Sequence, residues 1–370
     1  MQQQNWFLIP DEQSIETPSL VFYVERIEEN IKTLKAMVDD VERLRPHVKT
    51  HKCLEITAIL IAEGINKFKC ATIAEAEMLG IAKAKDVLLA YQPVGENINR
   101  FLTLQKTYSE TVFSCLTDDL HTAKKLSEKA VSANLVVNVY IDLNVGMNRT
   151  GVLPDLAAEL FTNVISLPNL NVKGLHAYDG HIHDSSMDIR MQKSEPVIAQ
   201  LLTLKQSCES ISNTKLTVIA GGTPTFPIYA NQTEFDCSPG TFVLWDKGYQ
   251  DAYPEQKFNT AALVVSRIVS KPANGLLCTD LGHKAIAAEK ELKNRVFFIN
   301  APDLEVISQS EEHLVLRTEY SSDFNIGDVL YGLPYHVCPT VALHEKAICM
   351  DANKNVQYWD IVSRKRKITI

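Results

Sequence analysis

Residues 45–52 (R-P-H-V-K-T-H-K) gather two lysines, one arginine and two histidines into one short segment. A lysine with cationic neighbours is difficult to protonate, so we expect the pKa of Lys49 to fall toward neutrality. A neutral lysine amine can condense with an aldehyde to form a Schiff base. The same residues are also compatible with a solvated basic turn.

The alternation of side chains along a strand separates the two lysines of this segment. Residues 44–49 read as a β-strand, in which Arg45, His47 and Lys49 share one face. Lys52 lies beyond the expected end of that strand. We therefore expect Lys49 to be the functional lysine.

A glycine-rich segment, residues 219–225 (I-A-G-G-T-P-T), follows another predicted strand. Gly221 and Gly222 allow the backbone to approach an anion closely, and the following amides and the Thr223 hydroxyl can bind phosphate oxygens. The alternative is an ordinary Gly-Gly-Thr-Pro turn.

Two polar segments follow predicted strands in the middle of the chain. Residues 141–151 contain Arg149, which could equally form a surface ion pair. Residues 176–184 (H-A-Y-D-G-H-I-H-D) are rich in metal ligands, and His181 and His183 have a plausible spacing for a metal. We favour a polar loop in which His181 or His183 transfers protons, and the sequence does not distinguish between these two histidines.

A second candidate metal site is the pair His336 and Cys338. On extended chain a His-x-Cys pair places both ligands on one side, and imidazole with thiolate suits zinc. Two protein ligands leave coordination positions for substrate and water, as a metal acting on a hydroxyl requires. As a bare pattern, His-x-Cys is also common without a metal.

The elements that must position these residues alternate between strand and helix from about residue 19 to residue 246. This alternation predicts a (β/α)8 barrel with its site at the strand ends, where Lys49, Arg149, Tyr178 and Gly221 lie. The predicted strands are residues 19–24, 44–49, 68–72, 87–91, 111–115, 135–142, 172–178 and 216–220. The predicted helices include residues 26–38, 54–64, 73–82 and 186–212.

After residue 246 the pattern changes to short strands with hardly any helix. These strands are residues 261–270, 275–281, 295–299, 304–308, 313–318, 328–331 and 356–362. We therefore expect a barrel over residues 14–250 and an all-β domain over residues 251–370, against which residues 1–13 pack.

Composition excludes several classes of function. The chain of 370 residues has 37 Lys and Arg against 45 Asp and Glu, which argues against a general nucleic-acid binder. No stretch approaches the roughly 18 apolar residues of a membrane span. The first residues lack a secretory signal and the cysteines form no CxxC pair, so we expect a cytoplasmic protein with reduced thiols.

Taken together, these motifs resemble those of the D-threonine aldolase and D-serine dehydratase family, which are alanine racemase-like pyridoxal 5′-phosphate (PLP) enzymes of fold type III. The resemblance runs from about residue 17 to residue 370 and implies that Lys49 carries PLP. It assigns further residues to the cofactor: His47, Arg149 beside the ring, Tyr178, and Gly221, Gly222 and Thr223 at the phosphate.

The resemblance also bears on the metal. Family members hold a divalent metal through a histidine and a second ligand two residues later, which is Cys in D-serine dehydratases and typically Asp in D-threonine aldolases. His336 and Cys338 therefore imply a dehydratase-like site for zinc or manganese, and they put an aldolase assignment in doubt.

The expected function is a metal-assisted PLP lyase that acts on a small D-3-hydroxy amino acid. Removal of the α-proton by Lys49 would lead to dehydration, whereas deprotonation of the β-hydroxyl would lead to retro-aldol cleavage. Relatives are commonly dimers, so we expect a homodimer. The alternatives are an amino-acid racemase, which needs no metal, and a non-catalytic PLP-carrier protein, which typically lacks the β domain.

Overall fold

The structure, a computed structural model, describes residues 6–370, and the chain divides into two compact units. The barrel unit comprises residues 34–49, 54–240 and 365–370. The β unit comprises residues 50–53 and 241–364 together with the N-terminal residues up to Thr33. The predicted packing of residues 1–5 lies outside the described residues.

The barrel unit is built on seven parallel strands that pair in the order of the sequence. They are β2 (Lys67–Cys70), β3 (Asp86–Leu89), β4 (Val112–Thr117), β5 (Val137–Leu143), β6 (Leu170–Ala177), β7 (Thr217–Ala220) and β8 (Phe235–Cys237). Leu44 forms a parallel bridge with Cys237, and His47 forms one with Lys69. Residues 44–47 thus occupy the eighth position between β8 and β2, and the predicted barrel class is confirmed.

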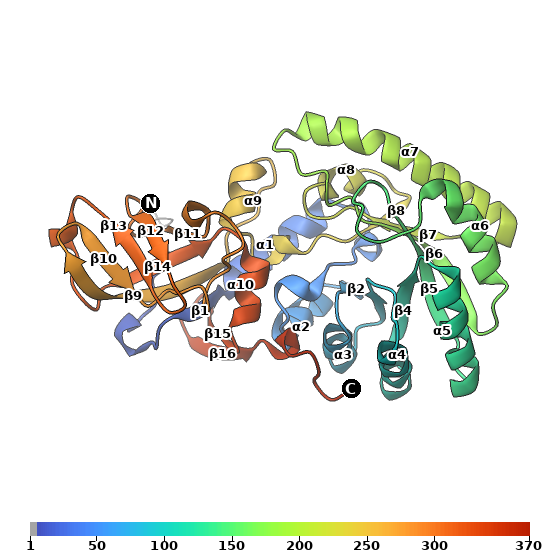
Figure 1. Cartoon of the computed structure of the whole chain (residues 1–370), viewed down its shortest axis with the longest axis horizontal. Helices are drawn as coiled ribbons and strands as arrows, with labels where there is room; N and C mark the ends of the chain where they lie inside the picture. The colour runs from blue at the N-terminus through green and yellow to red at the C-terminus, as the bar shows by residue number, and fades with distance from the viewer. Residues whose placement is uncertain (1–5) are drawn as a thin grey trace. The chain divides into compact units, whose positions relative to one another are not determined.

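Helices cover the outer side of this sheet, as Figure 1 shows for α3 to α7. The helices of the unit are α2 (Leu54–Ala62), α3 (Ile73–Ile81), α4 (Glu96–Thr107), α5 (Leu120–Ala133), α6 (Pro154–Ile165), α7 (Met187–Ser212) and α8 (Phe226–Ala230). Thr72, Asp119 and Ser186 accept hydrogen bonds from backbone amides in the first turns of α3, α5 and α7.

The interior of the barrel changes character along its axis. Leu88, Leu116, Tyr140 and Ile219 form an apolar cluster inside it. At the end where the strands begin, Arg45 donates hydrogen bonds of 2.6 and 3.1 Å to the carboxylate of Asp86. Arg45, expected to be a cationic neighbour of Lys49, is thus paired with a carboxylate.

The β unit contains a nine-stranded sheet. Its strands are β1 (Ser19–Tyr23), β9 (Ala262–Ala273), β10 (Leu276–Thr279), β11 (Val296–Phe298), β12 (Glu305–Gln309), β13 (Leu314–Arg317), β14 (Val329–Pro334), β15 (Lys346–Met350) and β16 (Val356–Asp360). β1 pairs antiparallel with β9 and parallel with β15, so the prediction that it opens the barrel is wrong. Phe7, Ile9 and Ile15 join the apolar cluster of this unit.

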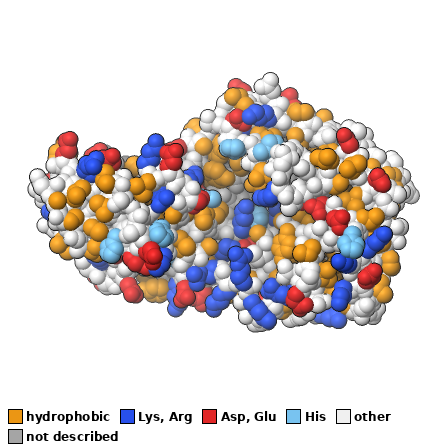
Figure 2. Space-filling model, in the orientation of Figure 1, with side chains coloured by type: hydrophobic (Ala, Val, Ile, Leu, Met, Phe, Trp, Pro, Cys, Tyr) orange, Lys and Arg blue, Asp and Glu red, His pale blue; other side chains and the backbone are white. Residues whose placement is uncertain are grey.

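Two short helices interrupt the β unit, α9 (Lys247–Ala252) and α10 (Val337–Leu343), and α1 (Val24–Ala36) follows β1. No helix within residues 6–370 has the length and apolar character needed to cross a bilayer. On the face drawn in Figure 2, side chains of Asp and Glu are interspersed with those of Lys and Arg.

Candidate active site

Lys49 lies in a single 3₁₀ turn, Val48–Thr50, that follows the extended residues 44–47. The N–H of His47 donates to the carbonyl of Pro239 (2.9 Å), and the N–H of Lys49 donates to Nδ1 of His47 (3.3 Å). The chain leaves the strand before Lys49, so the prediction that strand alternation orients this lysine is wrong. The buried His47 orders the turn that carries it.

Three cationic side chains converge on the half-buried ring of Tyr178, which follows β6. The ring centre lies 5.9 Å from Nζ of Lys49, 5.5 Å from Nζ of Lys69 and 4.9 Å from Cζ of Arg149. The structure thus brings together three predicted site residues, Lys49, Arg149 and Tyr178. A concentration of positive charge in a chain of net charge −8 suits an anionic ligand.

Lys69, the third residue of β2 and only 4% exposed, was not identified from the sequence. Its Nζ donates a hydrogen bond of 3.0 Å to Oγ of Ser238. Burial, reinforced by the charge of Lys49, lowers the pKa of Lys69 to about 7. The available signal was a lysine inside a short strand flanked by Phe68 and Cys70.

A buried acid–histidine pair lies on the neighbouring strands. Asp142 on β5 and His176 on β6 are directly opposite each other, and Nδ1 of His176 lies 2.7 Å from Oδ1 of Asp142. Burial lowers the pKa of His176. Nε2 of His176 is buried and has no hydrogen-bond partner in the described residues. A ligand or water that bonded this nitrogen would remove its desolvation cost.

The glycine segment lies directly after β7. Gly221 has φ +70°, which favours glycine, and a Cβ on Gly222 would lie 3.1 Å from Cε2 of Tyr178. The N–H of Ser238 donates to the carbonyls of Ala220 and Gly221, both at 3.1 Å. The N–H of Gly240 donates to Oγ1 of Thr223 (3.1 Å). Contacts with the Tyr178 ring and with Ser238 thus connect the segment to the cationic cluster.

The structure distinguishes the two candidate histidines. The ring of His181 packs on Gly146 (φ +122°), where a Cβ would lie 2.6 Å from Nε2, and Nδ1 of His181 is buried. His183 is exposed, and its Nδ1 lies 2.8 Å from the carbonyl oxygen of His181. Within residues 6–370, no group of three or more His, Cys, Asp or Glu side chains is arranged to hold a metal.

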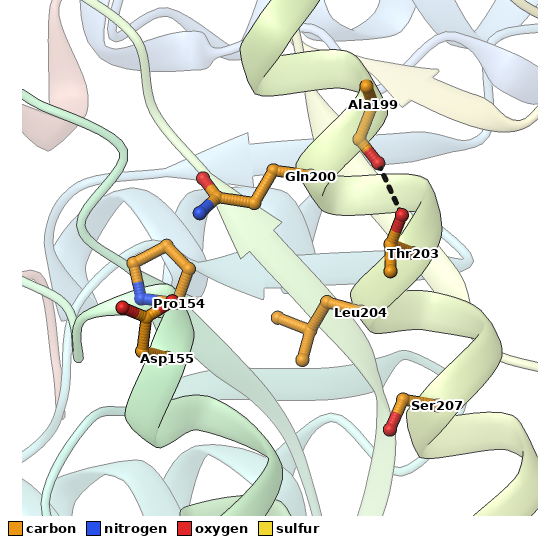
Figure 3. Close-up of a pocket in the computed structure, with 7 residues that line it drawn as sticks. All are labelled: Pro154, Asp155, Ala199, Gln200, Thr203, Leu204 and Ser207. Carbon is orange, nitrogen blue, oxygen red and sulfur yellow. Dashed lines mark hydrogen bonds between the residues drawn. The ribbon is translucent and has the colours of Figure 1, made fainter.

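Hollows in the barrel unit differ in their relation to this cluster. A crevice of about 10 Å³, room for one water, is lined by Asp142, Arg149 and Tyr178 among others. A hollow of about 420 Å³ lies between α6 and α7, and Figure 3 shows Pro154, Asp155 and side chains of α7 around it. No predicted site residue lines that second hollow.

In the β unit, His336 is the residue just before α10, without a capping hydrogen bond from its side chain, and Cys338 lies in the first turn of that helix. The prediction of a His-x-Cys pair on extended chain is therefore wrong. The turn is held by buried Asp246, whose carboxylate accepts from the N–H groups of Val337 (3.0 Å) and Tyr249 (2.9 Å). A helix start tied to Asp246 stands in place of the expected extended chain.

The donor groups of this pair have defined neighbours. Nδ1 of His336 is hydrogen-bonded to Glu289, and Sγ of Cys338 lies 3.1 Å from Oγ1 of Thr50. Burial lowers the pKa of His336, but the hydrogen bond and charge of Cys338, with Glu289 and Asp246, outweigh it and raise the pKa to about 9. Because Glu289 engages Nδ1, Nε2 is the ring nitrogen left to bind a metal.

Known proteins match both units. Residues 261–350 match a putative serine dehydratase domain. D-threonine aldolase from an Arthrobacter species is 27% identical over 95% of this chain and 93% of its own length. D-threo-3-hydroxyaspartate dehydratase from a Delftia species is 21% identical over 94% of this chain and 97% of its own.

A solved structure extends the likeness to the fold. D-threonine aldolase from Filomicrobium marinum superposes with a TM-score of 0.86, at 26% identity, over 95% of this chain and 96% of that chain. The family resemblance predicted from the sequence is confirmed. Residues 23–235, more than half of the chain, match the alanine racemase N-terminal domain, and the chain belongs to that family.

Proposed function

We propose that this chain is a PLP-dependent lyase that acts on D-3-hydroxy amino acids. The observation that carries the proposal is the convergence of Lys49, Lys69 and Arg149 on Tyr178, next to the glycine segment after β7. Relatives that cover nearly the whole chain include a D-threonine aldolase and a D-threo-3-hydroxyaspartate dehydratase, which support this class of substrate.

The residues present fit PLP. The buried, unpartnered Nε2 of His176 and the close approach of Gly222 to Tyr178 are features that a bound ring and phosphate would use. Gly221, Gly222 and Thr223 would bind the phosphate, Arg149 the phenolic oxygen, and Lys49 the aldehyde carbon. When bound, PLP supplies an electron sink for the bond that breaks at the substrate α-carbon.

Proton transfer is assigned to two residues. Lys49, held on its turn by His47, would move the proton at the substrate α-carbon. Of the two histidines, we favour His181, because its ring packs against the loop that carries Arg149 while His183 is exposed. Tyr178 would exclude water from the cluster and orient the cationic side chains around it.

His336 and Cys338 would hold a divalent metal, zinc or manganese. Imidazole and thiol are ligands that zinc prefers, and Glu289 on Nδ1 of His336 is the kind of carboxylate partner that orients a ligating histidine. Solved variants of D-threo-3-hydroxyaspartate dehydratase replace a histidine and, two positions later, a cysteine, the latter in a metal-free form. A bound metal supplies a Lewis acid for the β-hydroxyl of the substrate.

The same residues would serve dehydration or retro-aldol cleavage, so the reaction products distinguish the two reactions. Purified protein would be incubated with PLP and zinc or manganese, and with D-serine or D-threonine separately. A 2-oxo acid with ammonia indicates dehydration, which the His-x-Cys pair favours, and glycine with an aldehyde indicates cleavage. Formation of the L-enantiomer alone would indicate a racemase and contradict the proposal.

The expected homodimer and cytoplasmic location stay predictions.

A further inference from the structure

Lys69 is a buried lysine whose amine has no carboxylate within ion-pairing distance among the described residues. Its Nζ contacts Ser238. Burying a protonated amine in this way is unfavourable unless an opposite charge comes next to it. The side chain therefore requires a reason beyond packing.

The charged and titratable groups that interact with Lys69 come from several segments of the barrel unit. Lys49 and Arg149 are cations, Asp142 and Asp179 are carboxylates, and His176 and the Tyr178 ring complete the environment. Both carboxylates attract Lys69 without pairing with it directly, and each bonds another group: Asp142 bonds His176 (2.7 Å) and Asp179 accepts from Thr225 Oγ1 (3.0 Å).

The position of Lys69 relates it to the glycine segment. Its hydrogen-bond partner Ser238 donates its own N–H to the carbonyls of Ala220 and Gly221. Ser238 therefore links the amine to the segment assigned to the cofactor phosphate. The amine also approaches the same Tyr178 ring as Lys49 does. An anion bound there would be a direct negative partner for the amine.

We propose that Lys69 is a binding residue for the anionic cofactor and that it takes up a proton when the cofactor's phosphate or phenolate oxygens enter the site. The inference rests on the proposed function, because it assumes that PLP binds this cluster. It adds to that function a second lysine with a different role. Lys49 forms the covalent linkage, and Lys69 supplies positive charge.

Proton uptake follows from linkage. The pKa of Lys69 is lowered to about 7, first by burial and then by Lys49, so its amine is mostly neutral at about pH 8. A nearby anion favours the protonated form and raises the pKa. Binding at about pH 8 should therefore take up roughly 0.5 proton or more per site.

The test uses pyridoxine 5′-phosphate, an alcohol that cannot condense with Lys49. Calorimetric titration in buffers of different ionisation enthalpy gives affinity and proton uptake for the wild type and the variants Lys69→Met and Lys69→Arg. Lys67→Met is the matched control, because Lys67 begins the same strand but its Nζ pairs with Oδ2 of Asp236 at 3.5 Å. Circular dichroism verifies that each variant is folded. Titrations with pyridoxine, which lacks the phosphate, and with inorganic phosphate, which lacks the phenolate, show which of these two anionic groups causes the uptake.

We expect Lys69→Met to lose the uptake and to bind about tenfold or more weakly. Lys69→Arg should bind without uptake, because arginine stays charged, and Lys67→Met should match the wild type. Equal uptake in Lys69→Met and wild type would overturn the inference while leaving PLP binding intact. Uptake that appears only when D-serine is added to the holoenzyme would also overturn it. Failure of the wild type to bind the probe would contradict the proposed function as well.

Discussion

Asp142 and His176 face each other across β5 and β6, and a hydrogen bond of 2.7 Å joins Oδ1 to Nδ1 inside the barrel. The acid holds the imidazole in one orientation and leaves Nε2 as the ring atom without a partner among the described residues. The pair is buried and interacts electrostatically with Lys69, which approaches the Tyr178 ring.

The pair makes stability depend on pH in a defined direction. Burial lowers the pKa of His176, so below about pH 6.5 the unfolded state binds a proton that the folded state does not, and the contribution of His176 to stability is lost as the pH falls. His176→Asn removes this group, and we expect its urea stability to decline less between about pH 6.5 and pH 5. The exposed His121→Asn is the control, and an equal decline in both variants would contradict the assignment.

Lys69 predicts a gain in stability at alkaline pH. Between about pH 7 and pH 10 the unfolded state holds the lysine proton more tightly, so wild-type stability without cofactor rises with pH. Lys69→Met avoids the burial of the charge and should be more stable by a few kcal/mol near pH 7, with a difference that shrinks toward pH 10. Urea unfolding across this range measures the difference. A variant that is less stable at every pH would contradict the burial cost.

Most of the fold was predictable because its strands are apolar runs between turn residues and its helices carry amphipathic patterns. β1 was placed in the wrong sheet, since a strand with nearly every residue buried looks the same in a barrel or a β domain. β8 and β15 were not predicted from the sequence. β8 has only three residues, and β15 begins at Lys346, shortly after the short helix α10 ends at Leu343. Sequence spacing cannot decide which sheet a buried strand joins.

The sequence predicted those site residues that lie in recognisable local motifs. Lys49, Arg149, Tyr178 and Gly222 do meet, but Lys49 does so from a 3₁₀ turn and not from a strand. Lys69 and Glu289 were missed because their partners lie 169 and 47 residues away in the chain. Local sequence patterns do not reveal contacts between residues so far apart in the chain.

Glu289 should strengthen metal binding through His336. Loss of a carboxylate partner of a ligating histidine typically weakens metal affinity about 10–100-fold, so we expect that range for Glu289→Ala and a smaller effect for Glu289→Gln. Competition of zinc with a chromophoric chelator measures the affinity without any reaction. Exposed Glu291→Ala, which removes a carboxylate paired with Lys293, is the control. Equal affinities in Glu289→Ala and Glu291→Ala would exclude the role.

The two histidines should differ in their effect on turnover. His181→Asn removes the ring that packs on Gly146 and should lower kcat by about 10²-fold or more if it transfers protons. His183→Asn alters an exposed side chain and should change kcat by less than about threefold. Steady-state kinetics with D-serine or D-threonine measures both. A larger loss in His183→Asn would reverse the assignment.

Lys49, and no other lysine, is expected to carry the cofactor. Lys69 is the sharpest competitor, because its pKa of about 7 makes it a ready nucleophile next to the same Tyr178 ring. Protein incubated with PLP would be reduced with borohydride, which makes the linkage permanent, and digested for peptide mass spectrometry. We predict one phosphopyridoxyl group on Lys49. Its attachment to Lys69 or Lys52, or no attachment at all, would contradict the claim.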